Sequence, residues 1–255
     1  MKRYYLSVQK NIRDLGGMKT KDGHSIKKGC LFRGGELSQV DENDIKIINS
    51  FHLTDIIDFR TSQGFMVHAD HQFDNINYHN FPLQPLKSKE QLEIEMHNPF
   101  WFMEKGMTGV EYIKSLYCDL INNPISQEGY RNFFALIVDH PGVFYFHCSQ
   151  GKDRAGLAAA FLELALGVDL STVKEDYLLS NEAFLEETEQ IVESVKGAPW
   201  FNETIKQTIY EIALAREEYL DCALDEIKKN YQSLDNYFRN ILKTNIEKLN
   251  EMYLC

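Results

Sequence analysis

One ten-residue stretch, HCSQGKDRAG at residues 147–156, constrains what this chain can fold into more than any other. The four residues before it (143–146) are apolar and aromatic, and those after it (157–162) are rich in Ala and Leu. A short aromatic run is typical of a strand and a longer Ala/Leu run of a helix, so the pattern predicts strand, tight loop and helix. A helix start presents unpaired N–H groups and a partial positive charge, and both favour the binding of an anion.

Cys148 and Arg154 stand at the two ends of the predicted loop, and five residues separate them. A loop of that length can curl so that its N–H groups point inward at one phosphate. The thiolate is the reacting form of cysteine, and a helix N-terminus and a nearby arginine both favour it. We therefore expect Cys148 to attack phosphorus and form a phosphocysteine, while the planar guanidinium of Arg154 holds two phosphate oxygens.

The residues between these two ends complete the predicted phosphate site. Their N–H groups stabilise charge on the transferring group, and Gly151 lets the backbone turn tightly and approach the phosphate. The expected phosphate-binding residues are Ser149, Gln150, Gly151, Lys152, Asp153 and Arg154.

The reaction also needs an acid that protonates the leaving oxygen and a base that then activates water. Asp153, inside the loop, is the first candidate. Asp58 is the second, because it stands at the carboxyl end of a predicted neighbouring strand, where the sites of such sheets gather. An alternative interpretation makes Asp153 a structural carboxylate that binds loop amides or a nearby arginine. The catalytic candidates are therefore Cys148, Arg154, Asp153 and Asp58.

The spacing of Cys148 and Arg154 is weak evidence by itself, since Cys-x5-Arg arises by chance in about one chain in four of this length. Requiring all seven of the His, Cys, Gly, Lys, Asp, Arg and Gly residues at their spacings lowers that chance below roughly one in a million. A nucleotide-binding P-loop does not fit, because no Gly stands five residues before Gly151.

Metal-ligand residue types also gather in HADH at residues 68–71, with Asp74 and His79 nearby. Their spacing matches no metal motif, and we interpret the stretch as a solvated loop. His147 ends an apolar run, where a structural histidine is more common than a catalytic base. We expect no metal and no other cofactor.

Strands and helices alternate along most of the chain. We expect strands at residues 31–35, 53–59, 78–83 and 143–146, helices at 42–50, 109–122, 127–139 and 157–166, and mostly helix thereafter. Asp41, Ser233 and the TNIE pattern at 244–247 are the expected helix caps. Residues 84–108 mix charged and aromatic residues and fit either a flap over a pocket or a packed connecting segment.

This alternation predicts a three-layer α/β fold with a mostly parallel central sheet. We expect residues 1–255 to form a single domain, in which about 176–255 are a helical extension. The net charge of −11 argues against nucleic acid as a partner, because phosphate backbones require clustered Lys and Arg.

Location and redox state follow from what the chain lacks. No apolar run of transmembrane length or apolar signal core occurs, so we expect a cytoplasmic protein without stable membrane insertion. The five cysteines show no C-x-x-C spacing and indicate neither a disulfide scaffold nor a zinc site.

The pattern HCxxGKDRxG at residues 147–156 resembles the signature of the protein tyrosine phosphatase superfamily, in its bacterial branch of atypical tyrosine and lipid phosphatases. That branch is also similar in NIRDLGG (11–17), LFRGGELS (31–38), IDFR (57–60), DYLLSN (176–181) and the stretch 219–237. The resemblance implies the phosphatase α/β fold with a helical lid. It also implies Cys148 as nucleophile, Arg154 as phosphate binder, Asp153 as acid and base, and His147 as a support of the loop backbone.

Three features bear on the reaction within that branch. The Trp-Pro-Asp acid loop of ordinary tyrosine phosphatases is absent from the sequence, which favours an acid at Asp153 or Asp58. Ala155 stands where the branch usually carries Thr, whose hydroxyl donates to the departing thiolate, so we expect a slow second step. Lys152 adds positive charge beside the phosphate. In the family, a basic residue at this place in the loop accompanies acceptance of phosphoinositides. Stabilisation of a single bound phosphate explains the lysine equally well.

The sequence therefore predicts a cysteine-dependent phosphomonoesterase of phosphotyrosine or dual specificity, whose substrates are phosphorylated proteins or phosphoinositides. One alternative is an inositol polyphosphate phosphatase that uses the same loop. The other is a weakly active phosphate-binding module, which only Ala155 favours.

Overall fold

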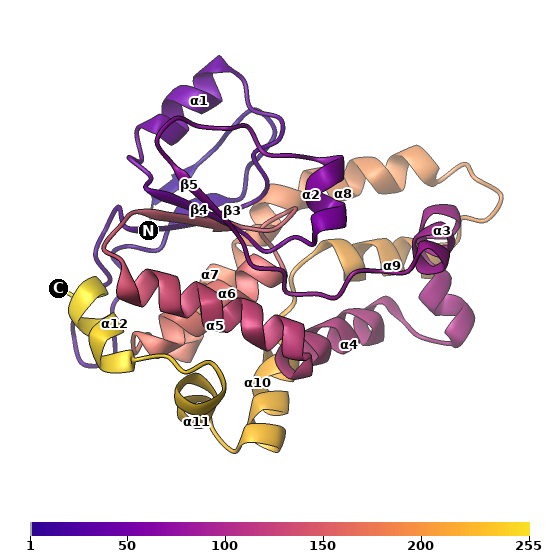
Figure 1. Ribbon diagram of the computed structural model, residues 1–255. Helices are drawn as coiled ribbons and strands as arrows, with labels where there is room; N and C mark the ends of the chain where they lie inside the picture. Colours follow the sequence, from indigo (N-terminus) through magenta and orange to yellow (C-terminus); the bar gives the residue numbers. More distant parts are fainter. Residues whose placement is uncertain (1) are drawn as a thin grey trace.

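A central six-stranded sheet organises the computed structural model, which describes residues 2–255 apart from the side chains of residues 65–67 and 96–97. The strands lie in the order β1-β2-β3-β6-β4-β5 (Figure 1). Their bounds are β1 Lys2–Tyr4, β2 Ile12–Asp14, β3 Leu31–Gly34, β4 Asp55–Asp58, β5 Asn77–Asn80 and β6 Phe144–His147. The predicted α/β class is confirmed.

The sheet is mostly parallel, as predicted. Strands β3, β6, β4 and β5 run in one direction, and β1 and β2 add an antiparallel edge. The register sets His147 of β6 opposite Gly34 of β3 on one side and Asp58 of β4 on the other. The loop that follows His147 therefore leaves the carboxyl edge of the sheet at its centre, between two neighbouring strands.

Helices cover the sheet and extend away from it. Those before β6 are α1 Glu42–Asn49, α2 Ser62–Val67, α3 Lys89–His97, the short helix η1 Trp101–Lys105, α4 Gly109–Asn122 and α5 Pro124–Asp139. Those after it are α6 Arg154–Ala165, α7 Leu170–Leu178, α8 Ser180–Val195, α9 Glu203–Ala213, α10 Glu217–Tyr231, α11 Leu234–Asn236, η2 Tyr237–Ile241 and α12 Ile246–Tyr253. Among the described residues, no helix is long and apolar enough to cross a membrane.

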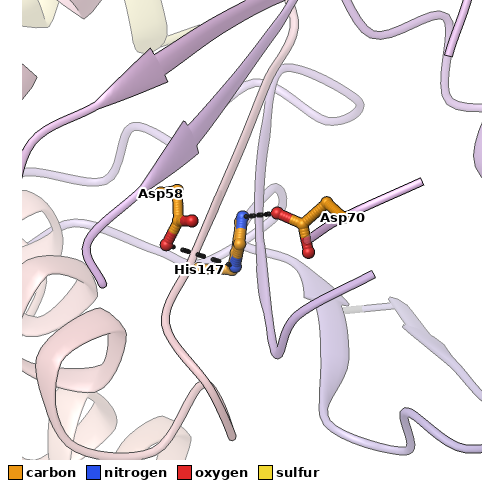
Figure 2. A group of neighbouring side chains, drawn as sticks. All are labelled: Asp58, Asp70 and His147. Atoms are coloured by element: carbon orange, nitrogen blue, oxygen red, sulfur yellow. Dashed lines mark ion pairs between the residues drawn. The ribbon is translucent and has the colours of Figure 1, made fainter. Parts of the chain in front are cut away.

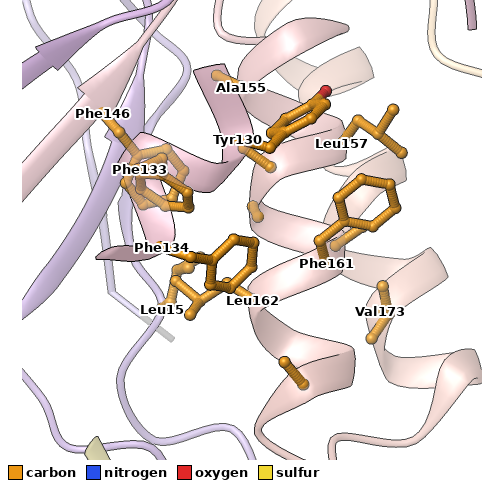
Figure 3. Packing of buried hydrophobic residues seen from close by; sticks show 14 of the residues in the cluster. Leu15, Tyr130, Phe133, Phe134, Phe146, Ala155, Leu157, Phe161, Leu162 and Val173 are labelled. Carbon is orange, nitrogen blue, oxygen red and sulfur yellow. The ribbon is translucent and has the colours of Figure 1, made fainter. Parts of the chain in front are cut away.

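Side chains alternate along the strands and supply two hydrophobic cores, which makes the arrangement three-layered. In β6, Phe144 and Phe146 enter the larger core and Tyr145 enters the smaller one, where Ile48 of α1 packs. In the larger core, Phe161 of α6 packs edge-on against Tyr130 of α5, with ring centroids 5.3 Å apart (Figure 3). Helix α6, whose first residue ends the loop, is thus fixed against one face of the sheet by its packing in the larger core.

Most of the predicted helices are confirmed. Some of their ends are shifted, because a capping residue sets where the helix begins. Helix 109–122 has the predicted bounds. Asp41 caps α1: its side chain accepts the N–H of Asp44, and its own N–H donates to the Asp44 side chain. Helix α5 begins at Pro124 rather than residue 127, because proline at the first helical position loses no hydrogen bond and Asn123 caps it. Ser233 caps α11 as predicted.

Two local predictions need correction. The last helix is capped by Asn245, whose side chain accepts the N–H of Lys248, and not by Thr244. The helix at 157–166, predicted to be apolar all round, contains Glu163, which is fully buried with its apolar neighbours.

Candidate active site

The loop between β6 and α6 carries three of the four predicted catalytic residues, Cys148, Asp153 and Arg154, whereas Asp58 lies at the end of β4. Cys148 follows the last residue of β6 and is 3% exposed, and α6 begins at Arg154. A guanidinium nitrogen of Arg154 donates to Ser149 Oγ at 3.3 Å, so the far end of the loop folds back over its start. Gly151 takes a left-handed conformation with φ of +73°, which turns the chain between them.

Hydrogen bonds from β3, from the turn after it and from the N-terminal segment hold the loop carbonyls from outside. Arg33 donates to Gly151 O at 2.8 Å, Asn11 donates to Gln150 O at 3.1 Å, and the Glu36 N–H donates to Ser149 O at 2.9 Å. Within residues 2–255, no hydrogen bond from the N–H groups of 149–153 is found. A loop with bonded carbonyls and unpaired N–H groups is a cradle for an anion.

A buried group of charges, Arg13, Arg33, Glu163 and Asp176 (the Asp176 cluster), lies behind this cradle. Arg13 and Arg33 both form ion pairs with Asp176, at 2.7 Å each. Burial opposes ionisation of Asp176, but the two guanidinium groups prevail and hold its pKa below the ordinary value. One terminal nitrogen of the Arg33 guanidinium donates to Asp176, and the other donates to Gly151 O. Asp176 therefore orients the arginine that holds the loop.

Glu163 is the unusual member of the Asp176 cluster. As a carboxylate it finds no hydrogen-bond donor among the described residues, whereas as a neutral acid it can donate to Asp176. Burial, reinforced by the negative charge of Asp176, raises the pKa of Glu163 well above its ordinary value. A neutral carboxylic acid is the form that such a site favours.

A second group of charges, Asp58, Arg60, Asp70 and His147 (the Asp70 cluster), supports the start of the loop. His147 Nε2 lies 3.1 Å from Asp70, and Nδ1 lies 3.9 Å from Asp58 (Figure 2). Burial disfavours the charged ring, but Asp58 and Asp70 outweigh it and raise the pKa of His147. His147 Nδ1 also lies 3.1 Å from the carbonyl of Cys148, consistent with a structural role at the loop.

The ligand atoms of Asp58, Asp70 and His147 lie within 4.8 Å of one another, as in a metal site. The guanidinium of Arg60 is already bonded to Asp58 and Asp70, each at 2.9 Å, and it also pairs with Glu36. A cation bound there would compete with a buried arginine for the same carboxylates. We therefore assign no metal to this group.

Asp70 was not singled out by sequence reasoning, and the HADH stretch is not wholly a solvated loop. His68, His71 and Asp74 are exposed as expected, whereas Asp70 is 5% exposed and faces inward to Arg60. His79 instead lies 2.8 Å from Asp55, across the neighbouring pair of strands. No local signal separates Asp70 from its neighbours, because its partners come from other segments of the chain.

The two candidate acids differ in their surroundings. Asp58 is buried, and both of its oxygens accept N–H groups of Arg60 at 2.8 to 3.0 Å. The Asp153 side chain is 21% exposed and stands at the capping position of α6, yet it makes no capping hydrogen bond. Its Oδ1 instead accepts the hydroxyl of Tyr117 at 3.1 Å. Among the described residues, Asp153 therefore binds neither the loop amides nor an arginine, the two possibilities of the alternative interpretation of its carboxylate.

Lys152 is the site residue whose surroundings differ most from expectation. Its side chain is 1% exposed, and its ammonium donates to the carbonyls of Ile212 and Ala213 at 2.6 and 3.1 Å. These carbonyls belong to the last turn of α9, where a cation is favoured. The ammonium also lies 3.6 Å from Asp153, so its contacts in this structure are with protein groups.

Comparisons with known proteins identify related phosphatases. The model of a tyrosine phosphatase family matches residues 5–255. A Cupriavidus necator protein named as a tyrosine-protein phosphatase is 27% identical over 251 residues, which cover 96% of this chain and 86% of that protein. The triple specificity protein phosphatase PtpB of Mycobacterium tuberculosis is 25% identical over 254 residues and 90% of each chain.

One solved structure is also similar. The core catalytic domain of the PP-IP phosphatase SIW14 from S. cerevisiae, in complex with citrate, has a TM-score of 0.37 at 10% identity, over 74% of this chain and 94% of that one. We draw no conclusion from a likeness of that size.

Proposed function

The chain belongs to the tyrosine phosphatase family, and we propose that Cys148, Asp153 and Arg154 are the residues with which it hydrolyses phosphomonoesters. One observation carries the proposal. The loop that joins Cys148 to Arg154 has its carbonyls bonded outward, while the N–H groups of 149–153 have no partner within the described chain. Such a loop can bind the phosphoryl oxygens and stabilise the charge that they carry during transfer.

The proposed reaction has two steps. In the first, the Cys148 thiolate attacks phosphorus and forms the S–P bond, the bond from phosphorus to the ester oxygen breaks, and Asp153 gives that oxygen a proton. In the second, Asp153 takes a proton from water, the water oxygen attacks phosphorus, and the S–P bond breaks to release phosphate and the thiolate. Arg154 holds the phosphoryl oxygens throughout.

Asp153 is preferred to Asp58 as the acid because of what each carboxylate already binds. Both oxygens of Asp58 already accept N–H groups of the buried Arg60, so neither is free to contact a leaving group. Asp153 Oδ2 accepts no hydrogen bond among the described residues, and the side chain reaches solvent. Asp153 also lies on the loop itself, next to Arg154.

We propose phosphorylated protein side chains as the substrate class. The name of the Mycobacterium tuberculosis relative, a triple specificity protein phosphatase, supports acceptance of more than one kind of phosphoryl group. A phosphoinositide or inositol polyphosphate is the second candidate, since Lys152 lies in the loop. For Lys152 to contact a second phosphate, its ammonium must leave the carbonyls of α9.

Hydrolysis of p-nitrophenyl phosphate in the presence of EDTA tests the proposed chemistry. We expect turnover that vanadate inhibits and that Cys148→Ser abolishes, because a hydroxyl is a far weaker nucleophile than a thiolate. Cys30→Ser, at a partly buried cysteine outside the loop, is the matched control and is expected to retain activity. Absence of hydrolysis by the wild type would favour a phosphate-binding module, and activity lost only on addition of EDTA would contradict the metal-free mechanism.

A further inference from the structure

Two buried tyrosines form a chain of hydroxyl groups that ends on Asp153. Tyr117 lies in α4 and Tyr177 in α7, and both are fully buried. Their hydroxyl oxygens are 2.7 Å apart, and the Tyr117 hydroxyl reaches Asp153 Oδ1 at 3.1 Å. The rings meet edge-on at 6.5 Å, so each hydroxyl is fixed by the packing of its own ring.

The direction of both hydrogen bonds follows from counting protons. A tyrosine hydroxyl carries one proton and can also accept. Tyr117 donates its proton to Asp153 Oδ1, because that oxygen can only accept, whether the carboxyl group is ionised or carries its proton on Oδ2. Its contact with Tyr177 must then be one that it accepts, so Tyr177 donates to Tyr117. The order is Tyr177 to Tyr117 to Asp153.

Both hydroxyls remain donors at any ordinary pH. Burial, with the nearby negative charge of Asp153 and the other ring, raises the pKa of Tyr117 well above its ordinary value. Burial likewise raises the pKa of Tyr177 far above the physiological range. The two hydroxyl groups therefore supply a permanent neutral donor to one oxygen of the Asp153 carboxyl group.

The charged and titratable groups that face Asp153 come from four elements. Lys152 of the loop lies 3.6 Å from its Oδ2, and the other groups that interact with it are Tyr112 and Tyr117 of α4, Tyr177 of α7 and Tyr219 of α10. Among these groups, the one donated hydrogen bond in the described structure comes from Tyr117. The carboxyl group is therefore oriented by that bond on Oδ1 together with the ion pair of Lys152 beside Oδ2.

We propose that Tyr117 and Tyr177 are positioning residues for the phosphatase reaction, which hold the Asp153 carboxyl group by its Oδ1 and leave Oδ2 to carry the transferred proton. This inference rests on the proposed function, in which Asp153 is the acid. Tyr117 acts directly on Asp153, and Tyr177 acts through Tyr117. The inference thereby assigns a role to Tyr177 of the DYLLSN segment, which lies outside the loop in the sequence.

The test compares two substrates that differ in their need for an acid. Phenyl phosphate has a poor leaving group and depends on protonation, whereas p-nitrophenyl phosphate has a good one and depends on it little. We expect Tyr117→Phe to lower kcat/KM for phenyl phosphate about tenfold, the effect of one lost hydrogen bond, and to leave p-nitrophenyl phosphate nearly unchanged. Tyr177→Phe is expected to give a smaller loss of the same kind.

The dependence on the leaving group provides a second readout. Across a series of aryl phosphates, the loss of kcat/KM in Tyr117→Phe is expected to grow as the leaving group becomes poorer, because a poorer leaving group depends more on the acid. A purely structural loss would lower kcat/KM by the same factor for every aryl phosphate.

Two further variants complete the design. Tyr253→Phe, in α12, removes a buried hydroxyl that donates to the carbonyl of Ile137 in α5 at 2.7 Å. This variant reports how much activity is lost with a buried tyrosine hydrogen bond away from the loop. Asp153→Asn is expected to lose about a hundredfold or more on phenyl phosphate if Asp153 is the acid.

The outcomes separate the inference from the function on which it rests. If Asp153→Asn shows no selective loss on phenyl phosphate, the assignment of the acid is wrong and the positioning role falls with it. If Asp153→Asn shows that loss but Tyr117→Phe affects both substrates equally, as Tyr253→Phe does, then the acid assignment stands and the positioning role is refuted.

Discussion

Gly151 is the residue at which the active-site loop tolerates least change. Its φ of +73° disfavours any side chain, and a Cβ there would lie 2.2 Å from the carbonyl oxygen of Gly34. Gly29 has nearly the same φ, +72°, but a Cβ there would meet nothing within 4 Å. The pair separates the cost of backbone strain from the cost of displacing the loop against β3.

We expect Gly29→Ala to lower the free energy of unfolding by about 1 to 2 kcal/mol, the cost of a left-handed non-glycine residue, and to leave activity intact. Gly151→Ala should cost more and should also weaken inhibition by vanadate, because the cradle must move away from Gly34. Urea denaturation and vanadate inhibition measure the two effects. Equal vanadate inhibition of the two variants would contradict this account of the loop.

Ala155 is the residue at which we expect this chain to be slow. It is fully buried in the first turn of α6, next to Arg154, and it offers no hydroxyl to the departing thiolate. The phosphocysteine should therefore accumulate, and a rapid burst of p-nitrophenol should precede slower turnover. Ala155→Thr is expected to shorten the life of the intermediate and raise kcat. Absence of a burst together with unchanged kcat in the variant would refute a slow second step.

At the scale of elements, α6 carries a titratable group into the core. The folded state raises the pKa of Glu163, so between the ordinary value of about 4.5 and the raised one the folded chain binds more protons than the unfolded chain. The contribution of Glu163 to stability is consequently lost as pH rises through that window. Glu163→Gln keeps the shape of the neutral acid and cannot ionise.

We expect Glu163→Gln to gain stability relative to the wild type as pH rises from about 4.5, the ordinary pKa of a glutamate. Urea denaturation at several pH values measures the difference in the free energy of unfolding. Glu187→Gln on α8, at an exposed position, is the control and should show no such trend. A difference for Glu163→Gln that is independent of pH would mean that the carboxyl group is ionised when folded.

At the scale of the whole molecule, Lys152 joins the loop to α9, a helix that follows it by about 50 residues in the sequence. Its ammonium neutralises the carbonyl end of that helix and stays within 3.6 Å of Asp153. Lys152 thereby couples the position of the C-terminal helices to the active site. Its availability to a second phosphate depends on whether that contact breaks.

Activity of Lys152→Ala on two substrates tests this. If Lys152 leaves α9 to bind a second phosphate, we expect the variant to lose about tenfold more activity on a multiply phosphorylated inositol lipid than on a phosphotyrosine peptide, the effect of one charge-assisted hydrogen bond. Lys206→Ala, at a half-exposed lysine of α9 that pairs with Glu203, is the control. Equal losses on both substrates would remove the argument for phosphoinositides.

The sequence by itself determined the parts of this protein that depend on neighbouring residues. The alternation of apolar runs predicted the central strands and α4 with its bounds, because periodicity and capping act within a few residues. The loop was equally clear, since Cys148, Gly151 and Arg154 lie within seven positions and one signature contains them. The proposed chemistry of the nucleophile and of the phosphate cradle was predicted from that signature.

Only the tertiary structure decided which groups support that chemistry. Asp176 meets Arg33 across 143 positions, Tyr117 meets Asp153 across 36, and Lys152 meets α9 across 60. No local rule pairs residues at such separations, because packing of the sheet and helices sets which buried polar groups must satisfy one another. The sheet register places His147 beside Asp58. The tertiary fold then places Asp70, rather than its exposed neighbours, against the Nε2 atom of the same histidine.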